Sequence, residues 1–79
     1  MAKPRKAYFI LETQTDGAGE LVALIAVEGT KGYYKTNWSW GKDAGLAREI
    51  AEQRNEKLGI SPDDAADIVI STMPKRILE

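Results

Sequence analysis

The chain contains no cysteine and no histidine among its 79 residues. Without cysteine it can form neither a disulfide nor a thiolate metal site, and without histidine it lacks the commonest zinc ligand and the commonest general base. A domain of this length buries only about 60% of the surface of its unfolded chain, so its stability without crosslinks is small. The apolar core and association with another chain remain as sources of stability. We therefore expect no cofactor, no metal ion and no enzymatic activity.

The chain also lacks a large excess of charge of either sign. Lysine and arginine total 11 and aspartate and glutamate total 12, and the net charge of −1 excludes a uniformly basic nucleic-acid binder. Residues 1–42 carry six basic and four acidic residues, a balance of +2. Residues 43–79 carry five basic and eight acidic residues, a balance of −3, so the two halves differ in sign.

Long hydrophobic runs are missing as well, and none reaches membrane-spanning length. The basic start of the chain resembles the first segment of a signal peptide. However, Glu12 interrupts the apolar stretch behind it, and no small-residue cleavage site follows. We expect an unprocessed, cytoplasmic protein with no membrane partner.

An apolar run at residues 21–27 (LVALIAV) is the most informative feature that is present. Side chains alternate across a strand, so a strand with one solvated face should alternate apolar and polar residues. This run is apolar on both faces. Either the chain covers both faces, or a second molecule covers one of them. A bare face of this kind predicts a homodimer at micromolar concentration or, if the chain is monomeric, a foreign protein partner.

Turn segments separate this run from a strand-like segment on each side. Residues 7–13 are rich in aromatic and branched side chains and lead to the hairpin signal Asp16-Gly17. The turn at residues 28–32 leads into a third strand at residues 33–38. Because short connections join antiparallel neighbours, we expect a three-stranded antiparallel meander with the apolar run in its centre.

From residue 43 the apolar period becomes that of amphipathic helices. The first predicted helix has an apolar stripe of Ala44, Ala47, Ile50, Ala51 and Leu58. Gly59 lies where a left-handed C-terminal cap belongs, and Ser61-Pro62 is a helix start. The second predicted helix ends before Pro74, and its stripe is Ala65, Ile68, Val69, Thr72 and Met73.

The fold class that follows is α+β with the order βββαα, a three-stranded antiparallel meander followed by two helices packed on one face. Residues 7–73 form a single domain in this interpretation. Residues 1–6 are a flexible basic tail, and residues 74–79 are a C-terminal tail.

Alternation assigns the side chains of each strand to two faces, but the register between strands is not readable from the sequence. One hypothesis places on one face Phe9, Leu11, Leu21, Ala23, Ile25, Val27, Trp38 and Trp40. The opposite face then carries Tyr8, Ile10, Val22, Leu24, Ala26, Tyr33 and Lys35. All aromatic residues lie in this half of the chain, so the large side chains of the core must come from the strands.

Aromatic, apolar and lysine side chains of the sheet form the candidate partner-binding site. We assign to it Tyr8, Ile10, Leu24, Tyr33, Tyr34, Lys35, Trp38 and Trp40. The aromatic residues could stack on bases while Lys31, Lys35 and Lys42 contact phosphates. The alternative is that one or both tryptophans fill the core and the lysines solubilise a strand edge. We favour the second interpretation because the net charge is negative.

Other polar groups have structural explanations. Asp63, Asp64 and Asp67 could hold a cation, but they lack the spacing of a calcium loop, and acidic residues stabilise a first helical turn. The basic residues of the first predicted helix alternate with glutamates, which predicts a solvated face with ion pairs; they are Arg48, Arg54 and Lys57. No serine has a histidine partner that could activate it.

The second half of the chain follows a pattern of single residues and short steps. They are Asn37-Trp38-Ser39, Ala44, Ala47, Ala51, Asn55, Leu58-Gly59, Ser61, Asp64-Ala65, Ile68-Val69 and Ser71-Thr72-Met73. This pattern resembles small uncharacterised proteins of proteobacteria and of their phages and mobile elements. That family has no assigned activity, so no functional residue transfers. The resemblance implies a setting in which very small, cofactor-free proteins act by occluding a larger complex, as anti-CRISPR proteins do.

These observations together predict a non-catalytic protein–protein interaction domain whose activity is carried by a face of the sheet. The partner is a second copy of the chain or a foreign protein, and by analogy the domain is a mobile-element inhibitor of a host complex. The alternative function is a small nucleic-acid-binding domain that uses the same aromatic residues and lysines. Protein binding predicts weak dependence on salt, whereas nucleic-acid binding predicts an affinity that falls steeply as salt rises.

Overall fold

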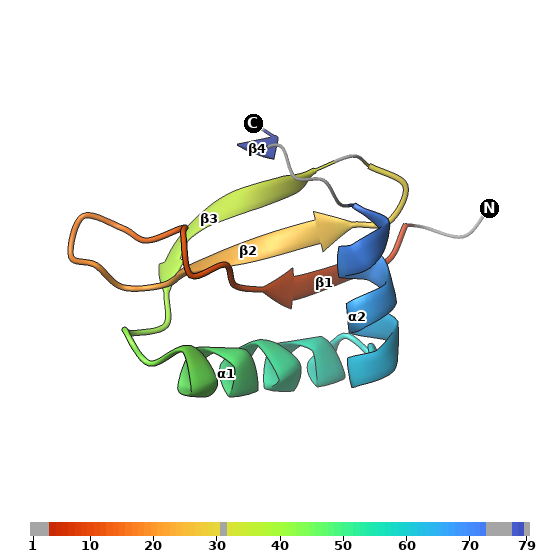
Figure 1. Cartoon of the computed structure of the whole chain (residues 1–79). Helices are drawn as coiled ribbons and strands as arrows, with labels where there is room; N and C mark the ends of the chain where they lie inside the picture. Colours follow the sequence, from red (N-terminus) through yellow and green to blue (C-terminus); the bar gives the residue numbers. More distant parts are fainter. Residues whose placement is uncertain (1–3, 31, 73–76, 79) are drawn as a thin grey trace.

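The structure is a computed structural model that describes residues 4–30, 32–72 and 77–78 (Figure 1). Three strands come first: β1 (Lys6–Phe9), β2 (Val22–Val27) and β3 (Tyr33–Ser39). Two helices follow, α1 (Ala44–Lys57) and α2 (Pro62–Ser71), and a short strand β4 (Ile77–Leu78) pairs in parallel with β3. The predicted α+β class and βββαα order are confirmed. Lys31, Met73 and Pro74, which the sequence analysis interpreted, lie outside the described residues.

The two predicted turns connect antiparallel strands in the expected order. Asp16 builds the first turn, because its Oδ1 accepts the N–H groups of Ala18 at 2.8 Å and Glu20 at 2.9 Å. These backbone hydrogen bonds lower the pKa of the Asp16 carboxyl. The first strand is shorter than the predicted 7–13, because the chain turns after Leu11, whose carbonyl accepts the N–H of Gln14.

The register of the sheet corrects one part of the predicted faces. Phe9 lies opposite Leu24, and Tyr8 lies opposite Ile25. The hypothesis had grouped Phe9 with Ile25, so the side chains of β1 were assigned to the wrong faces. The pairing of β2 with β3 agrees with the hypothesis, since Leu24 lies opposite Lys35. A one-residue change of register exchanges the two faces of a strand, and in β1 both faces are apolar, which makes its pattern ambiguous.

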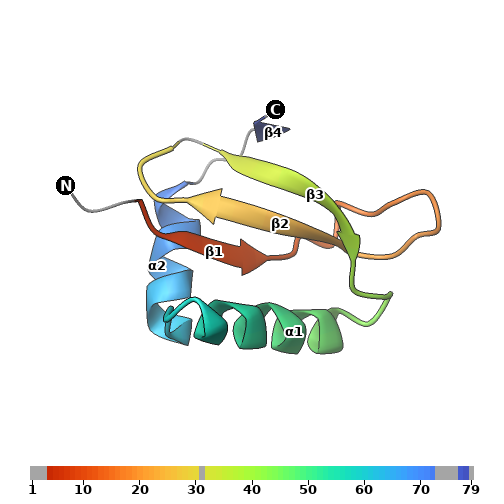
Figure 2. The ribbon, with the colours of Figure 1, turned by 180° about the vertical axis from the view of Figure 1, so that it is seen from behind.

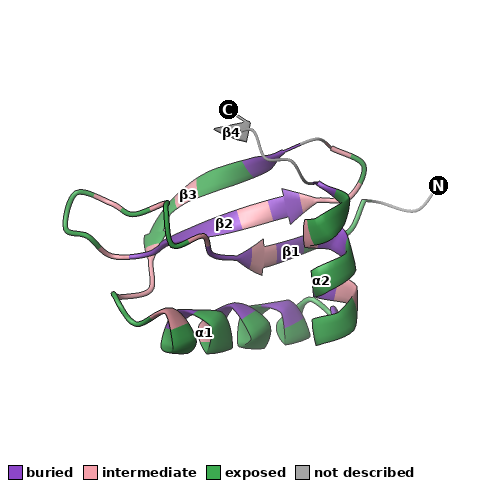
Figure 3. Ribbon diagram, viewed as in Figure 1, coloured by how far each residue is buried: buried purple, intermediate pink, exposed green. Residues whose placement is uncertain are grey.

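The main core lies between α2 and one face of the sheet (Figure 3). Its buried members are Ala7, Phe9, Val22, Leu24, Ala26, Tyr33, Ile60, Ala65 and Ile68. Leu24 and Ile68 are the largest hydrophobic side chains that are almost completely buried, and Phe9 and Tyr33 meet edge to face with ring centroids 5.5 Å apart. The large side chains of this core come mainly from the strands, as the distribution of aromatic residues predicts.

Helix α1 lies along the outer edge of β1 and not on the face that α2 covers (Figures 1 and 2). Its buried residues are Ala47, Ala51 and Asn55, which recur every four residues and form one narrow stripe. Ala47 belongs to a second, smaller core with Ile10 and Leu21. The sequence analysis placed both helices on one face; instead, α1 packs its alanine stripe against a strand edge, where small side chains allow a close approach.

The side chain of Asn55 closes the edge of β1. The backbone N–H of Tyr8 donates to Asn55 Oδ1 at 2.6 Å, and Asn55 Nδ2 donates to the carbonyl oxygen of Tyr8 at 3.1 Å. Asn55 is only 2% exposed. Its amide therefore satisfies an outward-facing backbone N–H and C=O pair, as a neighbouring strand would.

The connection between the helices confirms the predicted caps. Gly59 has a φ of 77°, and the N–H of Ile60 donates to the carbonyl of Asn55, which is a Schellman ending. Ile60, which directly follows Gly59, lies in the main core. Ser61 then caps α2, because its Oγ accepts the N–H of Asp64 at 3.2 Å.

Replacing Ser61 with alanine is expected to lower the free energy of unfolding by about 1 kcal/mol, since the N–H of Asp64 loses its acceptor. Urea denaturation followed by circular dichroism measures this loss. The control is Ser61→Asp, which keeps a capping oxygen and should stay close to the wild type. An equal loss in both variants would contradict the assignment of Ser61 as a cap.

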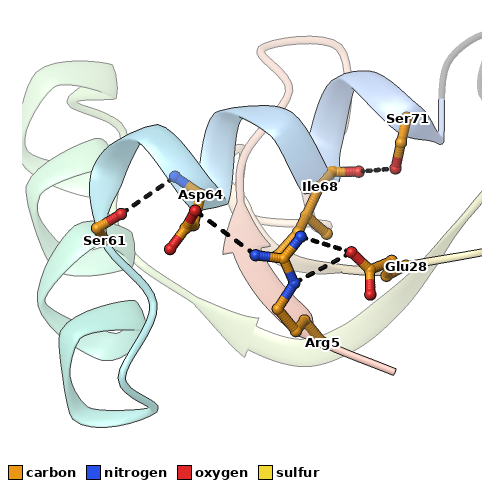
Figure 4. A network of polar contacts seen from close by, with 6 residues as sticks. All are labelled: Arg5, Glu28, Ser61, Asp64, Ile68 and Ser71. Atoms are coloured by element: carbon orange, nitrogen blue, oxygen red, sulfur yellow. Dashed lines mark hydrogen bonds and ion pairs between the residues drawn. The ribbon is translucent and has the colours of Figure 1, made fainter. Parts of the chain in front are cut away.

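Arg5 ties the start of β1 to the end of β2 and to α2 (Figure 4). Its guanidinium donates to Glu28 Oε2 at 3.0 Å and 2.6 Å and lies 3.5 Å from Asp64 Oδ1. The hydrogen bond from Arg5 lowers the pKa of the Glu28 carboxyl, and the same pair raises the pKa of Arg5. Arg5 and Lys6, which the sequence analysis placed in a tail, thus take part in the fold. Similarly, residues 77–78 of the expected C-terminal tail form β4.

Candidate functional site

One face of the sheet carries no helix of the described part of the chain, and Figure 2 shows it from the side opposite α2. Register and alternation place Tyr8, Ile25, Val27, Tyr34 and Trp38 on it, and we call these five residues the open face. Tyr34 is 40% exposed and Trp38 is 46% exposed, while the other three are half-buried. The open face is therefore an apolar and aromatic surface spread over three adjacent strands.

The aromatic rings of this region form a connected group. The centroid of Tyr8 lies 6.0 Å from that of Trp38 and 6.0 Å from that of Trp40. The guanidinium carbon of Arg54, from α1, lies over the Trp38 ring at 5.5 Å from its centroid. This cation–π contact fixes a positive charge at the margin of the open face.

An irregularity in β3 positions Trp38. Val22 lies opposite Ser39 and Leu24 opposite Lys35, so three residues of β3 face Ala23 alone. The hydroxyl of Thr36 fills the gap in the ladder, donating to the carbonyl of Ala23 at 2.7 Å and accepting the N–H of Trp38 at 3.2 Å. Such bulges bend a strand and re-aim its side chains. Nothing in the sequence pattern of residues 33–38 indicated this feature.

Three of the eight predicted site residues lie on the open face, namely Tyr8, Tyr34 and Trp38. Trp40 is half-buried against the smaller core, and its ring also meets the ring of Tyr8 on the open face. The two tryptophans therefore differ in their exposure to solvent. Trp38 is accessible, and Trp40 is mainly a packing residue.

The other four predicted residues lie elsewhere. Leu24 and Tyr33 are buried in the main core under α2, and Ile10 is buried in the smaller core. Lys35 is exposed, but it lies opposite Leu24 and hence on the face away from Trp38. These four side chains do not belong to the open face.

Sequence reasoning missed three contributors to the site, namely Ile25, Val27 and Arg54. The sequence analysis placed Ile25 and Val27 on one face of the sheet but left both out of the site, and the register now places Ile25 opposite Tyr8. Arg54 was interpreted as part of a solvated helix face with ion pairs, whereas it lies over Trp38. No sequence signal indicated Arg54, because the contact depends on where α1 docks. Arg48, from the same predicted face, lies 3.5 Å from Glu12.

A groove of about 360 Å³ lies between α1, α2 and β1, and Tyr8 is the one open-face residue among those that line it. It is lined mainly by apolar groups, with Arg48 and Glu52 among its polar residues. Among the described residues no group of three or more acidic side chains is arranged to hold a metal ion. None of the described helices is long and apolar enough to cross a membrane.

The aromatic surface has the composition of an interaction site, because tyrosine, tryptophan and arginine dominate the energetics of protein interfaces. Comparison of the chain with protein-family models, with curated proteins and with solved structures gives no match. The geometry of the open face is therefore the basis on which a function is proposed.

Proposed function

We propose that the chain is a small, non-catalytic protein–protein interaction domain and that the open face is its contact surface. The observation that carries this proposal is the continuous group of Tyr8, Ile25, Tyr34 and Trp38, which no helix of the described residues covers. Grouped apolar and aromatic side chains on the surface of a small domain mark interaction sites. The proposal does not depend on a cofactor.

The edges of the sheet are poor sites for a partner, which favours the face. At the β1 edge, Asn55 already occupies the outward N–H and C=O groups of Tyr8. At the β3 edge, β4 pairs with Tyr33 and Tyr34, and the irregularity around Thr36 interrupts the remaining ladder. Bulges and covered edges oppose the addition of a further strand. A partner that contacts side chains of the open face avoids these obstacles.

The resemblance to phage and mobile-element proteins extends this proposal by analogy. A small domain with one contact face can act by covering a surface that a larger complex needs. We accordingly propose an inhibitory role of the anti-CRISPR kind, in which binding occludes a host complex. This role rests on analogy, and the contact surface rests on the geometry.

The variant Ile25→Lys tests the contact surface. Ile25 is half-buried and faces away from α2, so lysine should leave the fold intact while placing a charge in the centre of the open face. The wild-type chain, used as bait in nuclease-treated extract of the source cell, is expected to retain a protein that Ile25→Lys does not retain.

The matched control for this variant is Ile70→Lys. Ile70 is 67% exposed on α2, away from the open face, so the same change of residue there should not affect binding. Circular dichroism should show both variants folded. Equal retention by wild type and Ile25→Lys would contradict the proposal.

A second candidate, single-stranded nucleic acid, is favoured by one observation, the 46% exposure of Trp38. Exposed aromatic side chains can stack on bases. Lys35, which was expected to contribute a phosphate contact, lies on the other face. Nuclease treatment distinguishes the two candidates, because a partner held through nucleic acid is lost on digestion.

A further inference from the structure

The charged side chains that the structure describes around the open face have one sign. Within β1, β2 and β3, all of whose residues are described, there is no acidic side chain. Lys6 is two residues before Tyr8 and lies opposite Val27, so it lies on the same side of the sheet, next to the open face. The sheet therefore contributes an apolar centre with a cation at one end.

Helix α1 adds further cations on the side that borders this face. Arg54 lies over Trp38, and Lys57 follows it by three residues and shares its side of the helix. The glutamates of α1 lie on a different side of the helix. Glu52 lines the groove beside α2, and Glu49, three residues before it, and Glu56, four residues after it, share its side. Although the chain as a whole carries a net charge of −1, the rim of the open face is positive.

We propose that the open face binds an acidic protein segment that carries an apolar anchor. This inference rests on the proposed function and states the chemistry of its partner. The anchor would lie over Ile25 and Tyr34, and carboxylates beside it would meet Lys6, Arg54 and Lys57. Complementary charge at an interface rim accelerates association and disfavours partners of the wrong sign.

A second copy of the chain fits this surface poorly. In a two-fold dimer formed through the open face, the same patch meets itself, so the cations of one rim approach those of the other. A single nucleic-acid strand also fits poorly, because the guanidinium of Arg54 already lies over a face of Trp38. In the described part of the chain, the basic residues around the open face are Lys6, Arg54 and Lys57, which is few for a phosphate backbone.

A random 16-residue peptide display library provides the probe. The library is selected on the full chain and depleted on Ile25→Lys, so that peptides specific for the open face remain. We expect the retained peptides to contain more aspartate and glutamate than lysine and arginine, next to an aromatic or aliphatic residue. Their affinity, measured by titration of tryptophan fluorescence, should fall about tenfold or more in Arg54→Glu.

The matched control is Arg48→Glu, which makes the same change of net charge on the other side of α1, where Arg48 borders the groove. It should change the affinity less than about twofold. Both variants are checked for folding by circular dichroism. Because Arg48 and Arg54 lie on one helix, a difference in peptide affinity between the two variants reports the position of the changed charge and not the net charge of the chain.

The possible outcomes separate this inference from the proposed function. Retained peptides that are neutral or basic, or equally weakened by both arginine variants, would overturn the acidic partner and leave the open face as a protein-binding surface. Sedimentation that shows a dimer in wild type and a monomer in Ile25→Lys would assign the face to a second copy and overturn the inference. Binding of an oligothymidine that displaces the peptides, or the absence of any peptide that depends on Ile25, would overturn both.

Discussion

Replacing Asn55 with leucine is expected to lower the free energy of unfolding by about 2–5 kcal/mol, because two buried backbone groups lose their partners. The leucine would have a similar shape but would leave the N–H and the C=O of Tyr8 without hydrogen bonds. A domain of 79 residues has a total stability of roughly 4–12 kcal/mol, so this loss is a large fraction of it. Urea denaturation measures the effect. The control Gln53→Leu changes an exposed amide on the same helix and should stay within about 0.5 kcal/mol of wild type.

Asn55→Asp tests the same contact through its dependence on pH. An ionised carboxylate can still accept the N–H of Tyr8, but it repels the carbonyl oxygen to which the amide donated. Burial raises the pKa of such a carboxyl above its unfolded value, so protonation stabilises the folded state. The destabilisation relative to wild type should therefore shrink as the pH falls from 7 towards about 4. A difference that is constant over this range would contradict the role of the donor.

Leu24→Ala is expected to cost about 2–5 kcal/mol, whereas Ile25→Ala should cost about 1 kcal/mol or less. Leu24 is 0% exposed in the main core, and its neighbour Ile25 is half-buried on the open face. Truncating Leu24 leaves a cavity beneath α2, whereas truncating Ile25 mainly changes a surface that solvent already reaches. Thermal and urea unfolding compare the two variants directly. A larger loss in Ile25→Ala would mean that β2 presents its other face to α2.

The features that the sequence predicts are those set by local chemistry. The turn at Asp16, the left-handed Gly59 and the cap at Ser61 depend on neighbours within a few residues, and each is present in the structure. The alternation of successive β2 side chains between the two faces of the sheet is also a local property. The βββαα order follows from these elements, since short connections leave few ways to arrange them.

The remaining features depend on contacts between distant residues. The faces of β1 could not be assigned because Tyr8 and Phe9 are equally suited to a core, and only the pairing with β2 decides between them. The position of α1 was missed because its alanine stripe fits a strand edge as well as a sheet face. The role of Asn55 is not indicated by the helical period, as its importance arises from a hydrogen-bonding partner 47 residues away.

The candidate site was likewise predictable only in part. The sequence indicated that aromatic residues of the strands would form it, and Tyr8, Tyr34 and Trp38 do lie together. It could not indicate that Tyr33 is buried, because Tyr33 and Tyr34 are chemically equivalent and differ only in the face they occupy. Arg54 enters the site through the docking of α1, which a helical period alone does not specify.

The contact between Tyr8 and Asn55 also has a consequence for how the chain folds. The hairpins that join β1, β2 and β3 are local contacts and can form early. The contact of α1 with β1 joins residues that are far apart in the sequence, and such contacts form more slowly. Until α1 arrives, the N–H and C=O of Tyr8 are free to pair with another unfinished molecule. The docking of the Asn55 amide thus removes the N–H and C=O of Tyr8 from the groups through which this edge could pair with another chain.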